Sequence, residues 1–266
     1  MAKTMSRMNY RIAIPSYNRS DILFEKTLSY LKECGVDNSI IDVFVANEEE
    51  YEIYKEKIPR EYYGNLIIGL EKLYRQRNFI TNYYPNNQPL VCLDDDVTEL
   101  RVLGKDGELR KVIDDFKSIV EYGFHLMRKH STTLCGIYAV DNPFFMNKTL
   151  SVGLYFCVGV FYLTFNDKSQ NMQLTITNKD DYERTIKTYL KRGKVIRFDN
   201  ITVKTNYYTE RGGLQATDER TSEEIYKAGK YLIRKYPQLC EENTGRKGKY
   251  FEIKFRKQKG NKKIKL

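Results

Sequence analysis

The chain has 266 residues, of which 41% are hydrophobic and 13% aromatic, so it can bury one sizeable core and is not disordered as a whole. Its formal net charge of +10 favours partners that carry negative groups. The longest apolar stretch, residues 152–165, contains two glycines, and the N-terminus lacks the apolar core of a signal peptide, so we expect a cytoplasmic protein without a membrane partner, in the host cytoplasm if it is viral.

The first hundred residues alternate strand and helix signals, each ended by turn residues. This order predicts an α/β fold in which a mostly parallel, Rossmann-type sheet is flanked by helices. Ligands of such sheets bind beyond the carboxyl ends of the strands, so the loops after the first and fourth strands open on one site. The expected strands are 10–14, 40–45, 65–68 and 89–93, and the expected helices are 20–31, 48–57 and 70–83.

After residue 97 the pattern changes to an α+β arrangement without a linker or a repeat. We expect one domain over residues 1–245 and a basic C-terminal segment, 246–266, which holds ten Lys and Arg against the single acid Glu252. Such a segment is attracted to phosphate backbones, or else only keeps the protein soluble. The expected elements are a hairpin at 98–109, helices at 114–130, 180–191 and 222–235, strands at 133–138, 152–165 and 172–177, an extended segment at 195–203 and a loop at 211–214.

Three consecutive aspartates, Asp94–Asp96, follow the apolar strand PLVCL. Neighbouring carboxylates at the end of a buried strand repel one another, so they cap a turn, hold a divalent metal or act as acid and base. The metal interpretation is favoured by Arg19, Arg75, Arg77 and Asn78, which the predicted topology brings near the same edge. Carboxylate oxygens suit Mg²⁺ or Mn²⁺, and guanidinium groups suit the diphosphate of a leaving nucleotide.

Three stretches, IAIPSYNRSDIL, RQRNFI and VCLDDDV, together resemble the nucleotide-sugar half of GT-A glycosyltransferases. TNKDDYERTIKTYLKRG and the RGGLQ loop resemble the acceptor half of the TET/JBP-associated members of that fold. This group includes base J glucosyltransferase and phage enzymes that glycosylate hydroxymethylated pyrimidines in DNA. The resemblance implies a GT-A-like catalytic domain with a nucleotide-sugar half at about 8–100 and an acceptor half at 101–245.

The same resemblance implies roles for individual residues. Asp94 would contact the ribose or base, Asp96 would bind Mn²⁺ or Mg²⁺ together with Asp94, and Asp95 would support either one. Of an acidic pair at the start of a helix, Asp180 and Asp181, one would be the general base, although negative charge there also suits the helix dipole. The remaining nucleotide-sugar contacts would be Pro15, Tyr17, Arg19, Arg75, Arg77 and Asn78.

The acceptor would meet the glycine loop and the basic segment. The residues expected to bind it are Arg211, Gly212, Gly213, Arg246, Lys247, Lys249, Arg256 and Lys257. One departure from the resemblance is the absence of a histidine after His130, because many GT-A enzymes use a C-terminal histidine as a metal ligand. Water or another oxygen donor would then complete the shell of the metal.

The leading function is a metal-dependent glycosyltransferase that moves a sugar from UDP or another nucleoside diphosphate to a 5-hydroxymethylpyrimidine in double-stranded DNA. The alternatives are a glycan or lipid-linked acceptor, a non-catalytic nucleic-acid-binding protein, and a two-metal nuclease or nucleotidyltransferase to which Asp141 contributes a carboxylate. The sequence leaves open the sugar, the modified base, and whether the anomeric configuration is retained or inverted.

Overall fold

The computed structural model describes residues 9–205, 220–245 and 250–266. Its centre is a nine-stranded sheet with the order β14-β8-β10-β7-β9-β4-β1-β2-β3. The pairings give seven strands one direction, and only β8 and β9 run opposite to them. The strands are β1 (Arg11–Pro15), β2 (Ile41–Val45), β3 (Asn65–Ile68), β4 (Pro89–Leu93), β7 (Leu134–Ile137), β8 (Thr149–Gly153), β9 (Phe161–Phe165), β10 (Val195–Phe198) and β14 (Lys262–Lys265).

The four N-terminal strands are parallel and follow the Rossmann order β3-β2-β1-β4, as the sequence predicts. The first helical stretch is continuous from Ser20 to Glu33 but widens into a π-helical turn at its middle. Two residues after its end stands Gly35, whose φ of +65° a side chain would disfavour. The helices of this half are α1 (Ser20–Leu23), α2 (Ser29–Glu33), α3 (Glu48–Lys57) and α4 (Leu73–Tyr83).

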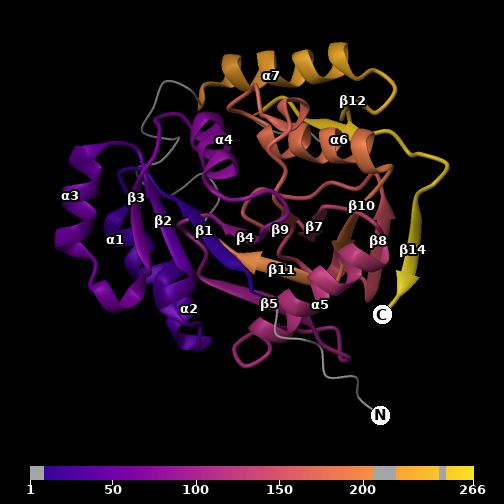
Figure 1. The fold of residues 1–266 in the computed structure, drawn as a ribbon. Helices are drawn as coiled ribbons and strands as arrows, with labels where there is room; N and C mark the ends of the chain where they lie inside the picture. Colours follow the sequence, from indigo (N-terminus) through magenta and orange to yellow (C-terminus); the bar gives the residue numbers. More distant parts are fainter. Residues whose placement is uncertain (1–8, 206–219, 246–249) are drawn as a thin grey trace.

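Both faces of the central strands are buried, which explains why their sequences are continuously apolar. Ile12 and Ile14 of β1 face the main core, whereas Ala13 between them faces a second cluster. Figure 1 shows α3 beside the β1–β2–β3 end of the fold and α6 (Asp180–Arg192) and α7 (Ser222–Lys235) stacked at the other end. The α/β, Rossmann-type prediction is therefore confirmed.

The second half departs from the prediction in three places. Residues 152–165 are not one strand: β8 ends at Gly153, and the chain crosses by residues 154–160 to the non-adjacent strand β9. Residues 172–177 form no strand, and only a short 3-10 turn, Gln170–Met172, precedes α6. The segment 195–203 is divided between β10 and β11 (Ile201–Lys204), which lie in different sheets.

Smaller elements complete the fold. α6 lies under α7, and Ile186 of α6 and Leu232 of α7 share an apolar cluster with Cys240 and Ile253. The sheet β11-β5-β6 and the pair β12-β13 are antiparallel. The elements concerned are β5 (Glu99–Leu103), β6 (Leu109–Lys111), α5 (Phe116–Lys129), β12 (Cys240–Glu242) and β13 (Ile253–Phe255).

The described part of the basic segment is built into the domain. Its strand β13 pairs with β12, and β14 pairs antiparallel with β8 as an edge strand of the central sheet. Charge alone suggests an appendage, but Ile253 is buried and the backbone of 262–265 completes the sheet. Among the described residues no helix has the length and apolar character needed to cross a membrane.

Candidate functional site

The three aspartates follow β4 at its carboxyl end, where the parallel topology predicts a ligand site. The backbone N–H of Asp94 donates to Val160 across the sheet. The hydroxyl of Thr27 donates to the carbonyl of Asp94 at 2.9 Å and accepts from the N–H of Val97 at 2.9 Å. Thr27 belongs to the π-helical turn, so this turn fixes the shape of the aspartate loop.

Arg19 joins the loop after β1 to the aspartates. Its Nη1 lies 3.0 Å from Asp95 and 3.4 Å from Asp96, and the side chains of Arg19 and Asp95 are largely buried. Asp95 also accepts from Ser16 at 2.7 Å, and the hydroxyl of Tyr54 is 2.7 Å from that of Ser16. Asp95 is therefore enclosed between the end of β1 and α3, where it holds Arg19 and Ser16 in place.

Arg77 links the two halves of the fold. It is buried on α4, with Nη2 at 3.1 Å from Oδ1 of Asp94 and Nε at 2.9 Å from Oδ2 of Asp180. Asp94 keeps 35% of its side chain exposed, more than any of its partners. Asp94 is thus the carboxylate that a ligand reaches most directly.

The acidic pair opens α6 and faces Arg77. Asp180 is buried, and a second arginine, Arg184, lies one turn further on with Nη1 3.8 Å from its Oδ2. The Arg184 guanidinium stacks 3.7 Å from the ring centre of Tyr162, and none of its nitrogens makes a hydrogen bond among the described residues. Asp180 therefore lies between two cations, and Asp181 beside it is free of ion pairing among those same residues.

Gly159 marks how closely these groups converge. A Cβ added there would come to 3.3 Å from Nη2 of Arg77, 3.6 Å from Nη2 of Arg184 and 3.6 Å from Cβ of Asp181. Gly159 of the crossing segment 154–160 thus lies against the two arginines and Asp181. A Cβ at this position would crowd Arg77 and would make ordinary van der Waals contact with Arg184 and Asp181.

Burial raises the pKa of three carboxyl groups of the site. It raises the pKa of Asp94 to about 6, against the opposing effect of Arg77. It raises the pKa of Asp95 to about 7, with Arg19 opposing the rise and Asp96 adding to it. Burial and the neighbouring charge of Asp180 raise the pKa of Asp181 to about 6, while Arg184 lowers it. A carboxyl that titrates near neutral pH is suited to proton transfer.

The fit of a divalent ion depends on the two outer aspartates. Among the described residues no three His, Cys, Asp or Glu side chains converge as a protein-only cage would require. Mg²⁺ commonly binds with one or two carboxylates and takes its other oxygens from substrate phosphates and water. Asp94 and Asp96 are both partly exposed, so they are the two carboxylates that would hold an ion in this mode.

The other predicted nucleotide residues are placed differently from one another. Pro15 is buried at the end of β1, and Tyr17 in the following loop is 38% exposed. Arg75 is exposed, and because residues two apart on a helix point about 200° from each other, it leaves α4 away from the buried Arg77. Asn78 faces another way again: its amide donates to and accepts from the backbone of Leu174 at 2.9 and 2.7 Å.

The predicted acceptor residues fall mostly outside the described chain: Arg211, Gly212, Gly213, Arg246, Lys247 and Lys249. Arg256 and Lys257 are described, and both are exposed just after β13. Arg256 donates from Nε to the carbonyl of Pro237 and pairs with Glu241 at 2.5 Å. Asp141, which a two-metal nuclease would require, instead pairs with Arg101 at 3.1 Å.

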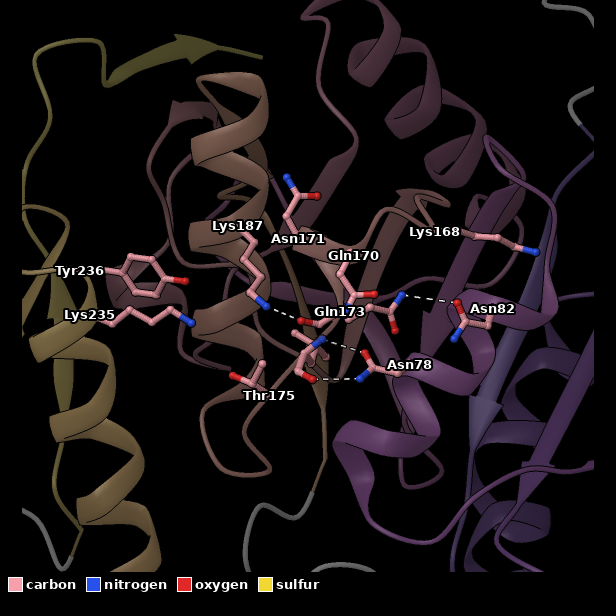
Figure 2. A pocket seen from close by; sticks show the side chains of 11 residues that line it. Asn78, Asn82, Lys168, Gln170, Asn171, Gln173, Thr175, Lys187, Lys235 and Tyr236 are labelled. Atoms are coloured by element: carbon pink, nitrogen blue, oxygen red, sulfur yellow. Dashed lines mark hydrogen bonds between the residues drawn. The ribbon is translucent and has the colours of Figure 1, made fainter.

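A polar cavity of 660 Å³ lies beside this site (Figure 2). Asn78 and Asn82 enter it from α4, Lys187 from α6 and Lys235 from the end of α7, with the segment 168–175 between them. The cavity shares α4 and α6 with the charged site, because Asn78 follows Arg77, and Lys187 lies on the helix that Asp180 opens.

Sequence reasoning missed Arg184, Tyr162, Ser16 and Gly159. Only Arg184 had a local signal, since it stands four residues after Asp180 on a predicted helix, where opposite charges commonly pair. Gly159 reaches the site through the crossing segment, Tyr162 reaches it from β9, and Ser16 does so through its hydrogen bond to the buried Asp95. Their contacts depend on how distant strands pair, and no spacing in the sequence shows that.

The fold is that of an α/β protein with a mostly parallel, Rossmann-type sheet, and charged side chains gather at the carboxyl ends of its strands. Its fold is shared by a crystal structure of S. aureus TarS, at 14% identity and a TM-score of 0.52, over 85% of this chain and 40% of that one. The structure of TarS 1–349 in complex with UDP is 15% identical over 74% of this chain and 59% of that one, with a TM-score of 0.47. The chain thus spans less than two thirds of either TarS structure, and neither a family model nor a curated protein matches it.

Proposed function

We propose that the protein is a glycosyltransferase that moves a sugar from a nucleoside diphosphate to an acceptor hydroxyl. The observation that carries the proposal is the convergence of Asp94, Arg77 and Asp180–Asp181 at the carboxyl end of β4. TarS, whose fold the chain shares, is a GT-A-type glycosyltransferase. A UDP complex of TarS 1–349 is known, and UDP-sugar is the donor that we propose here.

Asp181 is the base in this proposal. The acceptor oxygen forms a bond to the anomeric carbon as the bond from that carbon to the diphosphate oxygen breaks. The hydroxyl proton passes to a carboxylate oxygen of Asp181, and the electron pair of the broken bond leaves with the diphosphate. Asp180 is unsuited to this task because Arg77 and Arg184 stabilise its charge, whereas burial raises the pKa of Asp181 to about 6.

Asp96 and Asp94 would hold Mn²⁺ or Mg²⁺ together with the diphosphate. The ion would neutralise negative charge as it builds on the leaving group. Arg77 and Arg19 orient the two carboxylates from inside the protein, at 3.1 Å from Asp94 and 3.4 Å from Asp96. The positions of the Asp94 and Asp96 side chains therefore do not depend on a bound ion.

The acceptor in this proposal is a 5-hydroxymethylpyrimidine in DNA. Exposed cations favour a phosphate-rich partner, and Arg256, Lys257, Lys259 and Lys262 follow one another along the described C-terminal segment. A glycan is the second candidate, because amide side chains of the cavity, such as Asn82 and Asn171, also suit sugar hydroxyls. Both acceptors need the same donor site.

The test separates the donor from the acceptor. The protein with Mn²⁺ is mixed with UDP-glucose and other nucleotide sugars, and release of the nucleoside diphosphate into water is measured first. DNA that contains 5-hydroxymethylcytosine or 5-hydroxymethyluracil is then added, and nucleoside masses are read. We expect metal-dependent hydrolysis and a nucleoside heavier by one sugar. Modification of a glycan but of no DNA would replace the DNA acceptor, and absence of hydrolysis and transfer with every donor would overturn the proposal.

A further inference from the structure

The polar cavity beside the site has an unusual lining for its size. Three lysines, Lys168, Lys187 and Lys235, line it, and no carboxylate is among the eleven described residues around it. Five amides, a threonine and a tyrosine make up most of the rest, and Leu174 is the one aliphatic side chain among them. A volume of 660 Å³ is within the range of small-molecule sites, about 300–1,000 Å³.

The walls of the cavity are fixed. Asn78 clamps the backbone of Leu174 through two hydrogen bonds. Thr175 donates from its backbone N–H and its hydroxyl to Glu183 of α6 at 2.8 and 2.7 Å. Lys187 pairs with the same Glu183 at 3.0 Å. The segment 168–175 is thus tied to both α4 and α6, and the cavity is part of the folded structure and not a gap between loose loops.

The lysines differ in how far they are neutralised. Lys187 is buried and shares the charge of Glu183, whereas Lys235 donates to the neutral hydroxyl of Tyr231 at 2.6 Å. Lys168 is exposed, and no ion pair to its ammonium group is found among the described residues. Two of the three cations therefore remain available to an anion that enters the cavity.

The cavity also borders the basic C-terminal segment. Tyr236 lies on its α7 side, and the next residue, Pro237, accepts a hydrogen bond from Arg256 at 2.9 Å. Lys257 and Lys259 continue the exposed positive charge from there. A polyanion that follows these cations is led to the α7 side of the cavity. On the α6 side, Lys187 lies about 9 Å along the helix from Asp181, six residues away.

We propose that this cavity binds the acceptor nucleotide, drawn out of the DNA duplex, with Lys168 and Lys235 on its flanking phosphates and the amides other than Asn78 on its base. This inference rests on the proposed function and adds the acceptor subsite to it. Lysines bind phosphates as point charges, and Asn and Gln side chains match the hydrogen-bonding edges of bases. Tyr236 offers an aromatic face for stacking, as extruded bases commonly find in their pockets.

The test measures binding and transfer with Lys168→Gln and Lys235→Gln. Lys105→Gln is the matched control, since Lys105 is equally exposed but lies in the hairpin loop after β5. For an oligonucleotide containing 5-hydroxymethylcytosine we expect each cavity variant to raise Kd about fivefold to tenfold, and the control to leave it unchanged. The slope of log Kd against log salt should fall by about 1 for each lysine removed.

Extrusion of the base gives a second readout. A mismatch opposite the modified base removes part of the unpairing cost, so the mismatched duplex should bind more tightly than the paired one. Equal Kd values for the paired and the mismatched duplex would show that the base is not extruded. An unchanged Kd for DNA in both cavity variants would overturn the proposed subsite. If the two variants lost binding to a sulfated oligosaccharide as much as to DNA, the cavity would be assigned to a glycan. Donor hydrolysis by the unmodified protein is measured alongside, and its absence would mark failure of the proposed function and not of the subsite.

Discussion

The guanidinium carbon of Arg184 lies 3.7 Å from the ring centre of Tyr162, and this stacking is the main contact of a buried cation. Its nitrogens make no hydrogen bond among the described residues, and its one ion pair, with Asp180, is long at 3.8 Å. Burying a charge with so few partners costs free energy. An apolar side chain at this position would fill the same space without that cost. The position of Arg184 beside the acidic pair indicates an electrostatic role.

Arg184→Gln should therefore shift the pH dependence of transfer. Arg184 lowers the pKa of Asp181, so its removal raises that pKa and moves the midpoint of the rise in kcat/KM to higher pH. Arg184→Lys, which keeps the charge, should move the midpoint less. Arg192→Gln, a surface change on the same helix, is the control. A midpoint that stays in place in Arg184→Gln would show that the cation does not act on Asp181.

Activity of the unmodified protein should rise with pH through about 6. Burial and Asp180 raise the pKa of Asp181 to that value, so the base is protonated and inactive below it and ionised above it. The profile of kcat/KM against pH is the measurement. Asp181→Asn should lower kcat by about 10²- to 10⁴-fold and flatten this limb, and a limb that survives the substitution belongs to another group.

Asp180→Asn should act on stability more than on chemistry. The buried carboxylate compensates Arg77 and Arg184, and its loss leaves two buried cations short of negative charge. Breaking such a pair costs about 3–5 kcal/mol in the free energy of unfolding. Urea unfolding followed by circular dichroism measures this. Stability equal to that of Asp181→Asn would contradict the division of roles within the pair.

Asp96→Ala should remove metal-dependent transfer while the fold remains. Asp96 contacts Arg19 at 3.4 Å but is partly exposed, so its loss costs little packing. The expected loss of kcat/KM is at least about 100-fold, because charge on the leaving diphosphate is no longer neutralised. UDP with Mn²⁺ should also raise the Tm of the unmodified protein and not that of the variant. Asp106→Ala in an exposed loop is the control.

Asn261→Ala should destabilise the edge of the central sheet. The Asn261 side chain accepts from the N–H of Leu154 at 2.8 Å and donates to its carbonyl at 3.1 Å. Leu154 is buried, so its backbone groups would lose both partners, at about 1–3 kcal/mol. Thermal unfolding measures the change, with Lys259→Ala as the exposed control. An unchanged Tm would mean that water replaces the amide.

The sequence predicted most of the N-terminal half because its information is local. Each strand from β1 to β4 is an apolar run ended by turn residues, and the rule for parallel sheets then places Arg19 and Asp94 at one edge. The prediction also brought Arg77 to the aspartates, and the structure adds that Asp180 shares it. Which of these residues bind a nucleotide sugar stays a prediction.

The second half was harder to predict because its strands do not pair in chain order. Val152–Phe165 is apolar throughout, and nothing in it shows that β8 and β9 are separated by β10 and β7. The sequence also did not show which way the side chains of one helix point: Asn78 follows Arg77 in the chain, yet its side chain faces Leu174. A basic composition suggested a tail, whereas the alternation in the stretch FEIKF was the signal for the strand β13.

Pairing of β14 with β8 has a consequence for how the chain matures. Lys262 lies opposite Val152, so 110 residues must be synthesised after that position before its partner strand exists. Until then β8 is the outer strand, with open backbone groups that another nascent chain can occupy. The four residues that close it carry three lysines, whose mutual repulsion discourages the finished edge from recruiting a further copy. β8 is therefore protected against aggregation only after residues 262–265 have been synthesised. The same residues supply part of the positive surface.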